Sequence, residues 1–305
     1  MTGASERAAR RAVSGIVLLD KPAGLSSNRA LQAVKRLFAA EKAGHTGSLD
    51  PLATGMLPVC LGAATKIAGL LLDAEKTYRA GALFGVATET GDAEGAVVAE
   101  APAPQKTRAE VAEALAGLVG PLAQVPPMYS ALKHEGQRLY ALARRGETVE
   151  RKARTVTILA AELVALEWPR VEFTVECSKG TYVRTLVEEL AARLGTVGHV
   201  AALRRLALGP FREAQMRDLE ALRALESEGF EALDVVLLPA DAALAALPAV
   251  ELGAEEARRV GHGQRIAAAA AWPAGRVRLY APGPAFLGVG TVEPGGELRP
   301  QRLFV

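Results

Sequence analysis

The most informative stretch of this sequence is GHTGSLDPLATGMLPVCLGAATK, residues 44–66. Its glycines allow sharp backbone bends and a close approach of another molecule. They enclose a single carboxylate, Asp50, and Pro51 stiffens the backbone directly after it. A lone acid on a stiffened loop is typical of a reactive group that is presented at a fixed angle. An ordinary turn, whose aspartate bonds its own backbone, is the alternative that the spacing leaves open.

Length and composition favour a folded protein with one large and one small domain. The chain has 305 residues, which exceeds the common size of one domain. Half of the residues are apolar, which suits a folded core and excludes a disordered chain. No apolar run approaches the roughly 20 residues that span a bilayer, and the N-terminus lacks the apolar region of a secretory signal. Two distant cysteines, Cys60 and Cys177, are expected to be buried reduced thiols in a cytoplasmic protein.

Charge is distributed unevenly along the chain, although the formal net charge is only +2. Ten acids and two arginines between Arg217 and Glu256 give this segment a charge of −8, so the remainder carries +10. Clustered positive charge is what a phosphate-tracking surface requires, because affinity for RNA comes largely from neutralised phosphates. A solvated helix face is the alternative explanation of such a run. The basic cluster consists of Lys133, Arg138, Arg144, Arg145, Arg151, Lys152 and Arg154.

Strand-like and helix-like segments alternate irregularly, which predicts an α+β domain rather than a regular βαβ series. Helices are expected to begin near residues 27, 107, 139 and 183, the second of them with the capping box Thr107–Glu110 and a stop at Gly120. Strands are expected over residues 15–20, 76–88, 154–166 and 171–177.

The composition changes near residue 247, and short strand-like pieces broken by Pro-Gly turns follow residue 277. This pattern predicts a small β-rich barrel or sandwich at the C-terminus. The expected domains are a flexible basic arm over residues 1–14, a catalytic domain over 15–246 and a small domain over 247–305.

Five motifs in a fixed order carry a resemblance to a known family. They are GIVLLDKPAGLSSN (15–28), the segment 44–66, KTYRA (76–80), GTYVRTL (180–186) and HVAALRRLALGPF (199–211). Together they resemble the TruB family of tRNA pseudouridine synthases. The resemblance implies a mixed-sheet pseudouridine synthase catalytic domain followed by a PUA-like RNA-binding domain. It also implies that the T-loop uridine at tRNA position 55 is flipped out of its stack and isomerised.

The implied reaction breaks the N1–C1′ bond of a uridine, turns the base and joins C5 to C1′. Because nothing is oxidised or hydrolysed, no redox cofactor, nucleotide or metal is required. The sequence has no glycine-rich phosphate or dinucleotide motif and no metal-ligand spacing. Its four histidines are too scattered to indicate a metal site. We therefore expect no cofactor and no metal.

Asp50 is expected to be the nucleophile, attacking either C1′ of the sugar or C6 of the base. A buried carboxylate tends to protonate, so a fixed cation is expected beside it. The resemblance assigns Arg184, whose planar fork suits bidentate pairing. It also assigns Tyr78 to stack on the base and to transfer a proton. Strand alternation places Tyr78 on one face with Lys76 and Ala80, where a lone aromatic could equally belong to the core.

The resemblance places further residues around the substrate. Tyr182 and Leu203 would line the uridine pocket, although both could be ordinary packing residues. His45 would fill the space that the flipped base leaves, because a flat polar ring can stack there. A loop histidine that only orders the Asp50 loop is the alternative. Lys21 and Pro22 are expected to buttress this loop without direct chemistry.

The expected partner is tRNA, without an obligatory protein partner, and the chain is expected to be a monomer. Its catalytic domain and basic cluster would hold the T stem-loop, and its C-terminal domain would reach the acceptor end. One alternative is a synthase for another uridine in tRNA or ribosomal RNA. A second is a non-catalytic RNA-binding or chaperone protein with a structural Asp50, and a third is a hydrolase that releases free uracil.

Overall fold

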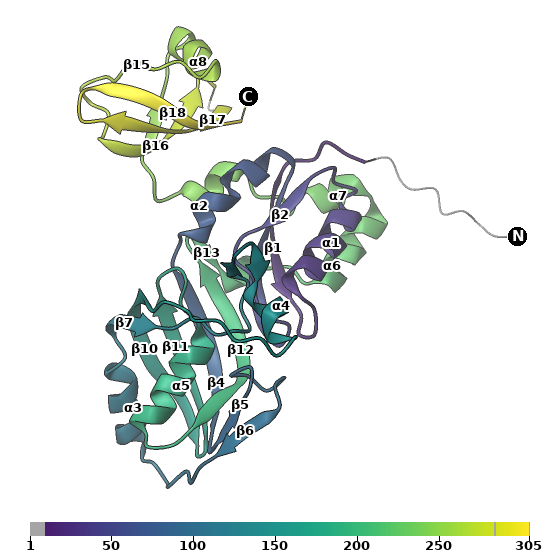
Figure 1. Cartoon of the computed structure of the whole chain (residues 1–305). Helices are drawn as coiled ribbons and strands as arrows, with labels where there is room; N and C mark the ends of the chain where they lie inside the picture. The colour runs from purple at the N-terminus through teal and green to yellow at the C-terminus, as the bar shows by residue number, and fades with distance from the viewer. Residues whose placement is uncertain (1–9, 284, 305) are drawn as a thin grey trace, which may run out of the picture.

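The computed structural model of the chain describes residues 10–283 and 285–304, so most of the expected basic arm lies outside the described residues. A nine-stranded mixed sheet with helices beside it forms the larger part of the molecule, and a separate five-stranded sheet forms the C-terminal part (Figure 1). The predicted α+β class, with a mixed sheet and a small β-rich C-terminal part, is confirmed. No helix among the described residues is both long and apolar enough to cross a membrane.

The large sheet consists of two halves with different helical cover. Its strand order is β1 (Gly15–Lys21), β3 (Thr54–Leu61), β12 (Gly198–Leu208), β4 (Lys76–Phe84), β11 (Arg170–Cys177), β10 (Arg154–Glu167) and β7 (Gly120–Gln124). Two short strands, β2 (Ala43–His45) and β13 (Phe211–Arg212), pair with β3 and β12. The helices are α1 (Ser27–Leu37), α6 (Leu219–Glu228) and α7 (Phe230–Asp234) beside β1, and α3 (Arg108–Ala116) and α5 (Val183–Arg193) beside the β4–β11 half (Figure 1).

Each half has its own apolar core. Val17, Leu57 and Val59 of β1 and β3 pack with Val34 of α1 and Leu222 of α6. In the other half, alternate residues of β4 and β11 pack against α3 and α5, among them Phe84, Phe173, Leu115 and Leu186. Each Å² of apolar surface that is buried stabilises a fold by about 25 cal/mol. These two clusters therefore make a large contribution to the stability of the sheet.

The two halves meet at a very short parallel ladder between β3 and β12. Only two residue pairs form it, Thr54 with Arg204 and Gly55 with Arg205. Gly55 has a φ of +94°, and a Cβ there would lie 2.3 Å from the backbone oxygen of Arg205. The glycine is therefore required for the close approach of β12, not of a ligand.

Local sequence signals explain most element boundaries. The Ser26 hydroxyl caps α1 by accepting from the Arg29 N–H, and the predicted capping box of Thr107 and Glu110 is confirmed. Two expectations are wrong. The strand expected over 76–88 ends at Phe84, because Gly85 takes a φ of +93° and turns the chain into β5 (Val86–Thr88). α3 ends at Ala116, and Gly120 begins β7 instead of stopping the helix.

The remaining elements are small. β6 (Val97–Glu100) pairs with β5, and β8 (Lys133–His134) pairs with β9 (Gln137–Arg138) ahead of α4 (Leu139–Ala143). A 3₁₀ segment, Gly62–Ile67, leads into α2 (Ala68–Leu72) after β3.

The C-terminal sheet has the order β14 (Ala249–Glu251), β16 (Gly275–Ala281), β17 (Ala285–Glu293), β18 (Glu297–Leu303) and β15 (Ile266–Ala267), with α8 (Ala254–Gly261) beside it. It has its own apolar core, which includes Val250, Val277 and Leu298. Val289 nevertheless packs with the β1 side of the large sheet, and the Tyr280 hydroxyl donates to Asp241 at 2.7 Å. These contacts join the two parts.

Candidate active site

The loop that carries Asp50 is fixed by Ser27 at the start of α1. The Ser27 hydroxyl accepts from the Leu49 N–H at 2.7 Å and donates to the Leu49 C=O at 3.0 Å. Gly24 adds a backbone bond to the carbonyl of Pro51 at 2.9 Å. The residues on both sides of Asp50 are therefore bonded to the segment that follows β1, which leaves the carboxylate at the end of a short rigid arm.

Lys21 is fully buried at the end of β1, where its ammonium group has only carbonyl partners. It donates to the carbonyls of Pro22 at 2.8 Å, Leu25 at 2.7 Å and Pro51 at 3.3 Å. Burial lowers the pKa of Lys21 to about 8, and the charge of Asp50 opposes this change. Pro22 is exposed and takes part through its carbonyl. The Lys21 ammonium group therefore links the Pro51 carbonyl, directly after Asp50, to the turn that follows β1.

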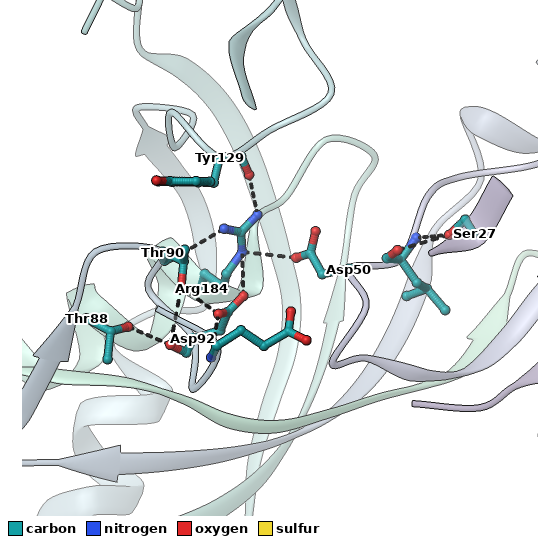
Figure 2. A network of polar contacts seen from close by, with 9 residues as sticks. Ser27, Asp50, Thr88, Thr90, Asp92, Tyr129 and Arg184 are labelled. Carbon is teal, nitrogen blue, oxygen red and sulfur yellow. Dashed lines mark hydrogen bonds and ion pairs between the residues drawn. The ribbon is translucent and has the colours of Figure 1, made fainter. Parts of the chain in front are cut away.

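Arg184 lies next to Asp50, as the sequence predicts. Its Nε is 3.0 Å from Asp50 Oδ2, while Nη1 donates to the Thr90 C=O and Nη2 to the Tyr129 C=O, each at 2.7 Å (Figure 2). The expected bidentate pairing is wrong, because both Nη groups are bonded to backbone carbonyls. Arg184 is 5% exposed and Asp50 is 41% exposed, so the cation is fixed and the carboxylate remains accessible.

Asp92 is a second carboxylate beside Arg184, and sequence reasoning missed it. Asp92 Oδ2 lies 3.9 Å from Arg184 Nε, and its side chain is only 6% exposed. Asp92 Oδ1 accepts from the Thr90 hydroxyl at 2.6 Å and from the Glu94 N–H at 3.1 Å (Figure 2). A Thr-Gly-Asp sequence gives only a turn signal, so nothing in the sequence distinguished this aspartate from an ordinary turn residue.

The surroundings of Asp50 act on its ionisation in opposite directions. Burial raises the pKa of Asp50, Arg184 opposes this, and the charge of Asp92 adds to the rise, so that the net direction is upward. Because 41% of the side chain is exposed, water hydrates part of the carboxylate and limits the penalty. We therefore expect Asp50 to protonate at a higher pH than a free aspartate.

Tyr78 lies in the core of the β4–β11 half. It is buried on the same face of β4 as Lys76 and Ala80, which confirms the predicted alternation. It belongs to the cluster that contains Leu49, the residue before Asp50. Burial raises the pKa of Tyr78, and the Arg205 guanidinium opposes this rise by its charge.

Tyr182 precedes α5 and is held there by Gln124 of β7. Gln124 Oε1 accepts from the Tyr182 N–H at 3.0 Å, and Nε2 donates to the Tyr182 C=O at 3.3 Å. Gln124 is buried, and sequence reasoning missed it. The guanidinium of Arg154 lies 5.0 Å from the centre of the Tyr182 ring and donates to the Gly180 C=O. Arg154, expected on the RNA backbone surface, therefore supports the segment before Arg184.

His45 and Leu203 lie on different strands near the junction of the two halves. His45 is half-buried in β2, its Nδ1 has no hydrogen-bond partner, and burial together with the charge of Arg205 lowers its pKa. Leu203 pairs with Ala80 across β12 and β4. It lines an open groove of about 540 Å³ that adjoins the Asp50 loop through Leu52, although Asp50 does not line this groove.

The basic cluster is divided between exposed and engaged side chains. Lys133, Arg138 and Lys152 are exposed, and Arg144 lies 5.8 Å from the centre of the Tyr140 ring. Arg145 pairs with Glu147 at 2.5 Å, and Arg151 donates to the Pro126 C=O.

Within the described residues no group of three or more His, Cys, Asp or Glu side chains lies together as a metal site.

Three models of one protein family match consecutive parts of the chain. The model "TruB family pseudouridylate synthase (N terminal domain)" matches residues 35–183. The model "tRNA pseudouridylate synthase B C-terminal domain" matches residues 184–245, and "Pseudouridine synthase II TruB, C-terminal" matches residues 248–304.

Individual relatives extend the match over nearly the whole chain. The tRNA pseudouridine synthase B of Nitrosococcus oceani is 50% identical over 292 residues, which cover 96% of this chain and 95% of that protein. The protein of the same name from Pseudomonas aeruginosa is 51% identical over 296 residues and 97% of each chain. The chain therefore belongs to the TruB family. A chain from the crystal structure of a Cbf5–Nop10–Gar1 complex is 25% identical with a TM-score of 0.76, covering 95% of this chain and 85% of that chain.

Proposed function

We propose that this protein is a tRNA pseudouridine synthase that isomerises the T-loop uridine at tRNA position 55, with Asp50 as its nucleophile. The observation that carries the proposal is the pairing of a fixed, buried guanidinium with an accessible carboxylate on a rigid loop. Family membership and full-length relatives that are named tRNA pseudouridine synthase B support the same substrate.

The proposed reaction uses the Asp50 carboxylate and exchanges bonds within one uridine. One oxygen of Asp50 faces Arg184 and the other is free to attack C1′ of the sugar or C6 of the base. The N1–C1′ bond breaks, the base turns and the C5–C1′ bond forms. C5 then loses its proton and N1 gains one, so that neither water nor electrons are consumed. Tyr78 is the proposed group for the transfer at C5.

RNA recognition would use surfaces around this site. Tyr182 and Leu203 would contact the flipped uridine, and His45 would stack in the space that it leaves. The exposed members of the basic cluster would bind phosphates of the T stem-loop. The C-terminal sheet would act as a PUA-like domain at the acceptor end. In this proposal the protein acts as a cytoplasmic monomer, with domains over residues 15–246 and 247–305.

The test uses the purified full-length chain and an unmodified tRNA transcript. Pseudouridine is mapped by chemical labelling and primer extension, and free uracil is measured in the same samples. We expect labelling at position 55 and no uracil. Asp50→Asn should abolish labelling and bind the transcript with nearly unchanged affinity, because it removes the nucleophile at almost constant shape. If this variant labels tRNA at the wild-type rate, Asp50 is not the nucleophile.

The same experiment separates the alternatives. Labelling at a uridine elsewhere in tRNA or ribosomal RNA supports a synthase with another target. Binding without labelling, in both proteins, supports a non-catalytic RNA-binding protein. Release of uracil supports a hydrolase.

A further inference from the structure

Arg205 is a fully buried arginine without a carboxylate partner. It lies in β12 at the junction of the two half-sheets, paired with Gly55 of β3 on one side and Tyr78 of β4 on the other. None of the ion pairs among the described residues includes it. Its charge is therefore kept inside the protein without the compensation that buried charges normally have.

The contacts of Arg205 are to the backbone around the Asp50 loop. Its Nε donates to the Met56 C=O at 2.6 Å and its Nη2 to the Gly47 C=O at 3.0 Å. Its Nη1 has no partner with hydrogen-bond geometry, and a Cβ at Gly47 would lie 3.4 Å from it. Arg205 thus links the turn three residues before Asp50 to β3, and its Nη1 group makes no hydrogen bond within the described residues.

The charge of Arg205 also acts on the proposed proton-transfer group. Charged or titratable groups from three elements influence the Tyr78 hydroxyl: Arg205 on β12, Cys177 on β11 and Asp50 on the loop. Arg205 is the cross-strand partner of Tyr78, and its charge favours the ionised phenol, whereas Cys177 and Asp50 oppose ionisation. Arg205 is the only one of the three that stabilises the phenolate.

We propose that Arg205 is a positioning residue for this reaction, which fixes the turn before Asp50 and supplies the positive charge that lets Tyr78 accept the proton from C5. The proposal rests on the proposed function and assigns to Arg205 no contact with RNA. The C5–H bond breaks, its electron pair restores the ring and the proton moves to the phenolate oxygen. A purely structural Arg205 would stabilise the loop and would not affect how the rate depends on pH.

Two variants separate charge from hydrogen bonding. Arg205→Gln keeps a donor for the backbone carbonyls and removes the charge, whereas Arg205→Lys keeps the charge and loses the planar fork. Single-turnover rates at saturating enzyme are measured on the tRNA transcript between pH 6 and pH 10, together with tRNA affinity and thermal unfolding. If Tyr78 acts as a phenolate, the rate rises with pH.

For Arg205→Gln we expect the increase of the rate with pH to occur at higher pH than in the wild-type protein. The rate at pH 7 should fall about tenfold for each pH unit by which the profile moves. The tRNA affinity should remain within about threefold, because the residue does not contact RNA. For Arg205→Lys we expect a lower rate with the wild-type pH profile. In a Tyr78→Phe background, Arg205→Gln should no longer change the profile, because the titrating hydroxyl is absent.

Arg278 offers a matched control far from the loop. Its Nε donates to the Leu247 C=O at 2.9 Å and its Nη1 to the Tyr280 hydroxyl at 3.1 Å, so it also joins a backbone carbonyl and a tyrosine. Arg278→Gln should lower the unfolding temperature without changing the pH dependence of the rate.

An unchanged pH profile for Arg205→Gln, with wild-type protein active and Asp50→Asn inactive, overturns the proposal while the proposed function stands. If Arg205→Gln fails to fold, a shifted pH profile of the rate for Arg205→Lys overturns the proposal instead. If the wild-type protein forms no pseudouridine, the proposed function itself fails.

Discussion

Two arginine–carboxylate clusters each join parts of the chain that are distant in sequence, and they are built in opposite ways. In the first, Arg184 is 5% exposed and meets Asp50 through one nitrogen only. In the second, Arg204 is 32% exposed and pairs with Asp20 through two parallel bonds at 2.9 and 2.7 Å and with Glu213 at 2.7 Å. The better-paired arginine is the more exposed of the two.

The difference indicates which cluster is functional. An exposed ion pair contributes about 0–1 kcal/mol, even when its geometry is good. At the site, both terminal nitrogens of Arg184 are bonded to backbone carbonyls, and the carboxylate keeps a free oxygen. The Asp50 carboxylate therefore has an oxygen that a substrate atom can contact. Reactive sites commonly contain groups whose bonding is not satisfied by the protein itself.

The largest effect should follow from Arg184→Met. The change leaves Asp50 without its cation, so we expect the rate of pseudouridine formation to fall by about 10³-fold, the scale of losing one fixed electrostatic contact. Because Arg184 lowers the pKa of Asp50, its loss should raise that pKa further and move the acid limb of activity to higher pH. Single-turnover rates between pH 4 and pH 8 measure both effects.

Arg184→Lys is the control for this prediction. It keeps a positive charge but cannot bond Asp50, Thr90 and Tyr129 together, because an ammonium group lacks the planar fork. It should shift the acid limb less than methionine does. An acid limb at the wild-type pH in Arg184→Met would contradict the assignment of this limb to Asp50.

A smaller effect, of opposite sign on pH, is expected for Asp92→Asn. The carboxylate of Asp92 raises the pKa of Asp50, so its removal should move the acid limb to lower pH. Asparagine can keep the Oδ1 bonds to Thr90 and Glu94 but loses the charge that faces Arg184. We therefore expect a rate about tenfold lower at pH 7, with an acid limb that extends further into acid. A limb that moves to higher pH would contradict the role of Asp92.

The sequence was sufficient to predict the residues of the site that a motif or a local rule marks. The glycine-rich loop marks Asp50 and the motif resemblance selects it over an ordinary turn residue, the same resemblance assigns Arg184 to the expected cation, and Thr107 and Glu110 mark the cap of α3. Asp92 and Gln124 escaped, because the contacts that distinguish them join residues distant in the chain and depend on strand register. The end of β4 was not predicted either. The residues after Gly85 have a strand-like composition, but the positive φ of that glycine ends the strand.

Gln124→Ala tests the scaffold on the other side of Arg184. It removes both bonds to the Tyr182 backbone. The Tyr182 C=O keeps the helical bond from the Leu186 N–H at 3.1 Å, so the N–H is the group that loses its partner, which should lower the free energy of unfolding by about 1–3 kcal/mol. Because Tyr182 directly precedes α5, Arg184 should be held less firmly, and we expect a rate about threefold to tenfold lower with an unchanged pH profile. Thermal unfolding and the same rate assay measure this. A large shift of the acid limb would indicate that Gln124 acts on charge instead.

The smallest effect should follow from Arg204→Met, which removes the better-paired arginine of the second cluster. Its partners Asp20 and Glu213 are 29% and 51% exposed, so water can solvate both carboxylates when the guanidinium is gone. We expect the free energy of unfolding to fall by no more than about 1 kcal/mol and the rate and its pH profile to stay at wild-type values. Denaturant unfolding at low and high salt checks the first expectation, because screening weakens an exposed pair. A loss of activity comparable to that of Arg184→Met would contradict this interpretation. It would mean that the functional cluster is the one whose arginine makes more bonds to carboxylates, not the one whose carboxylate keeps a free oxygen.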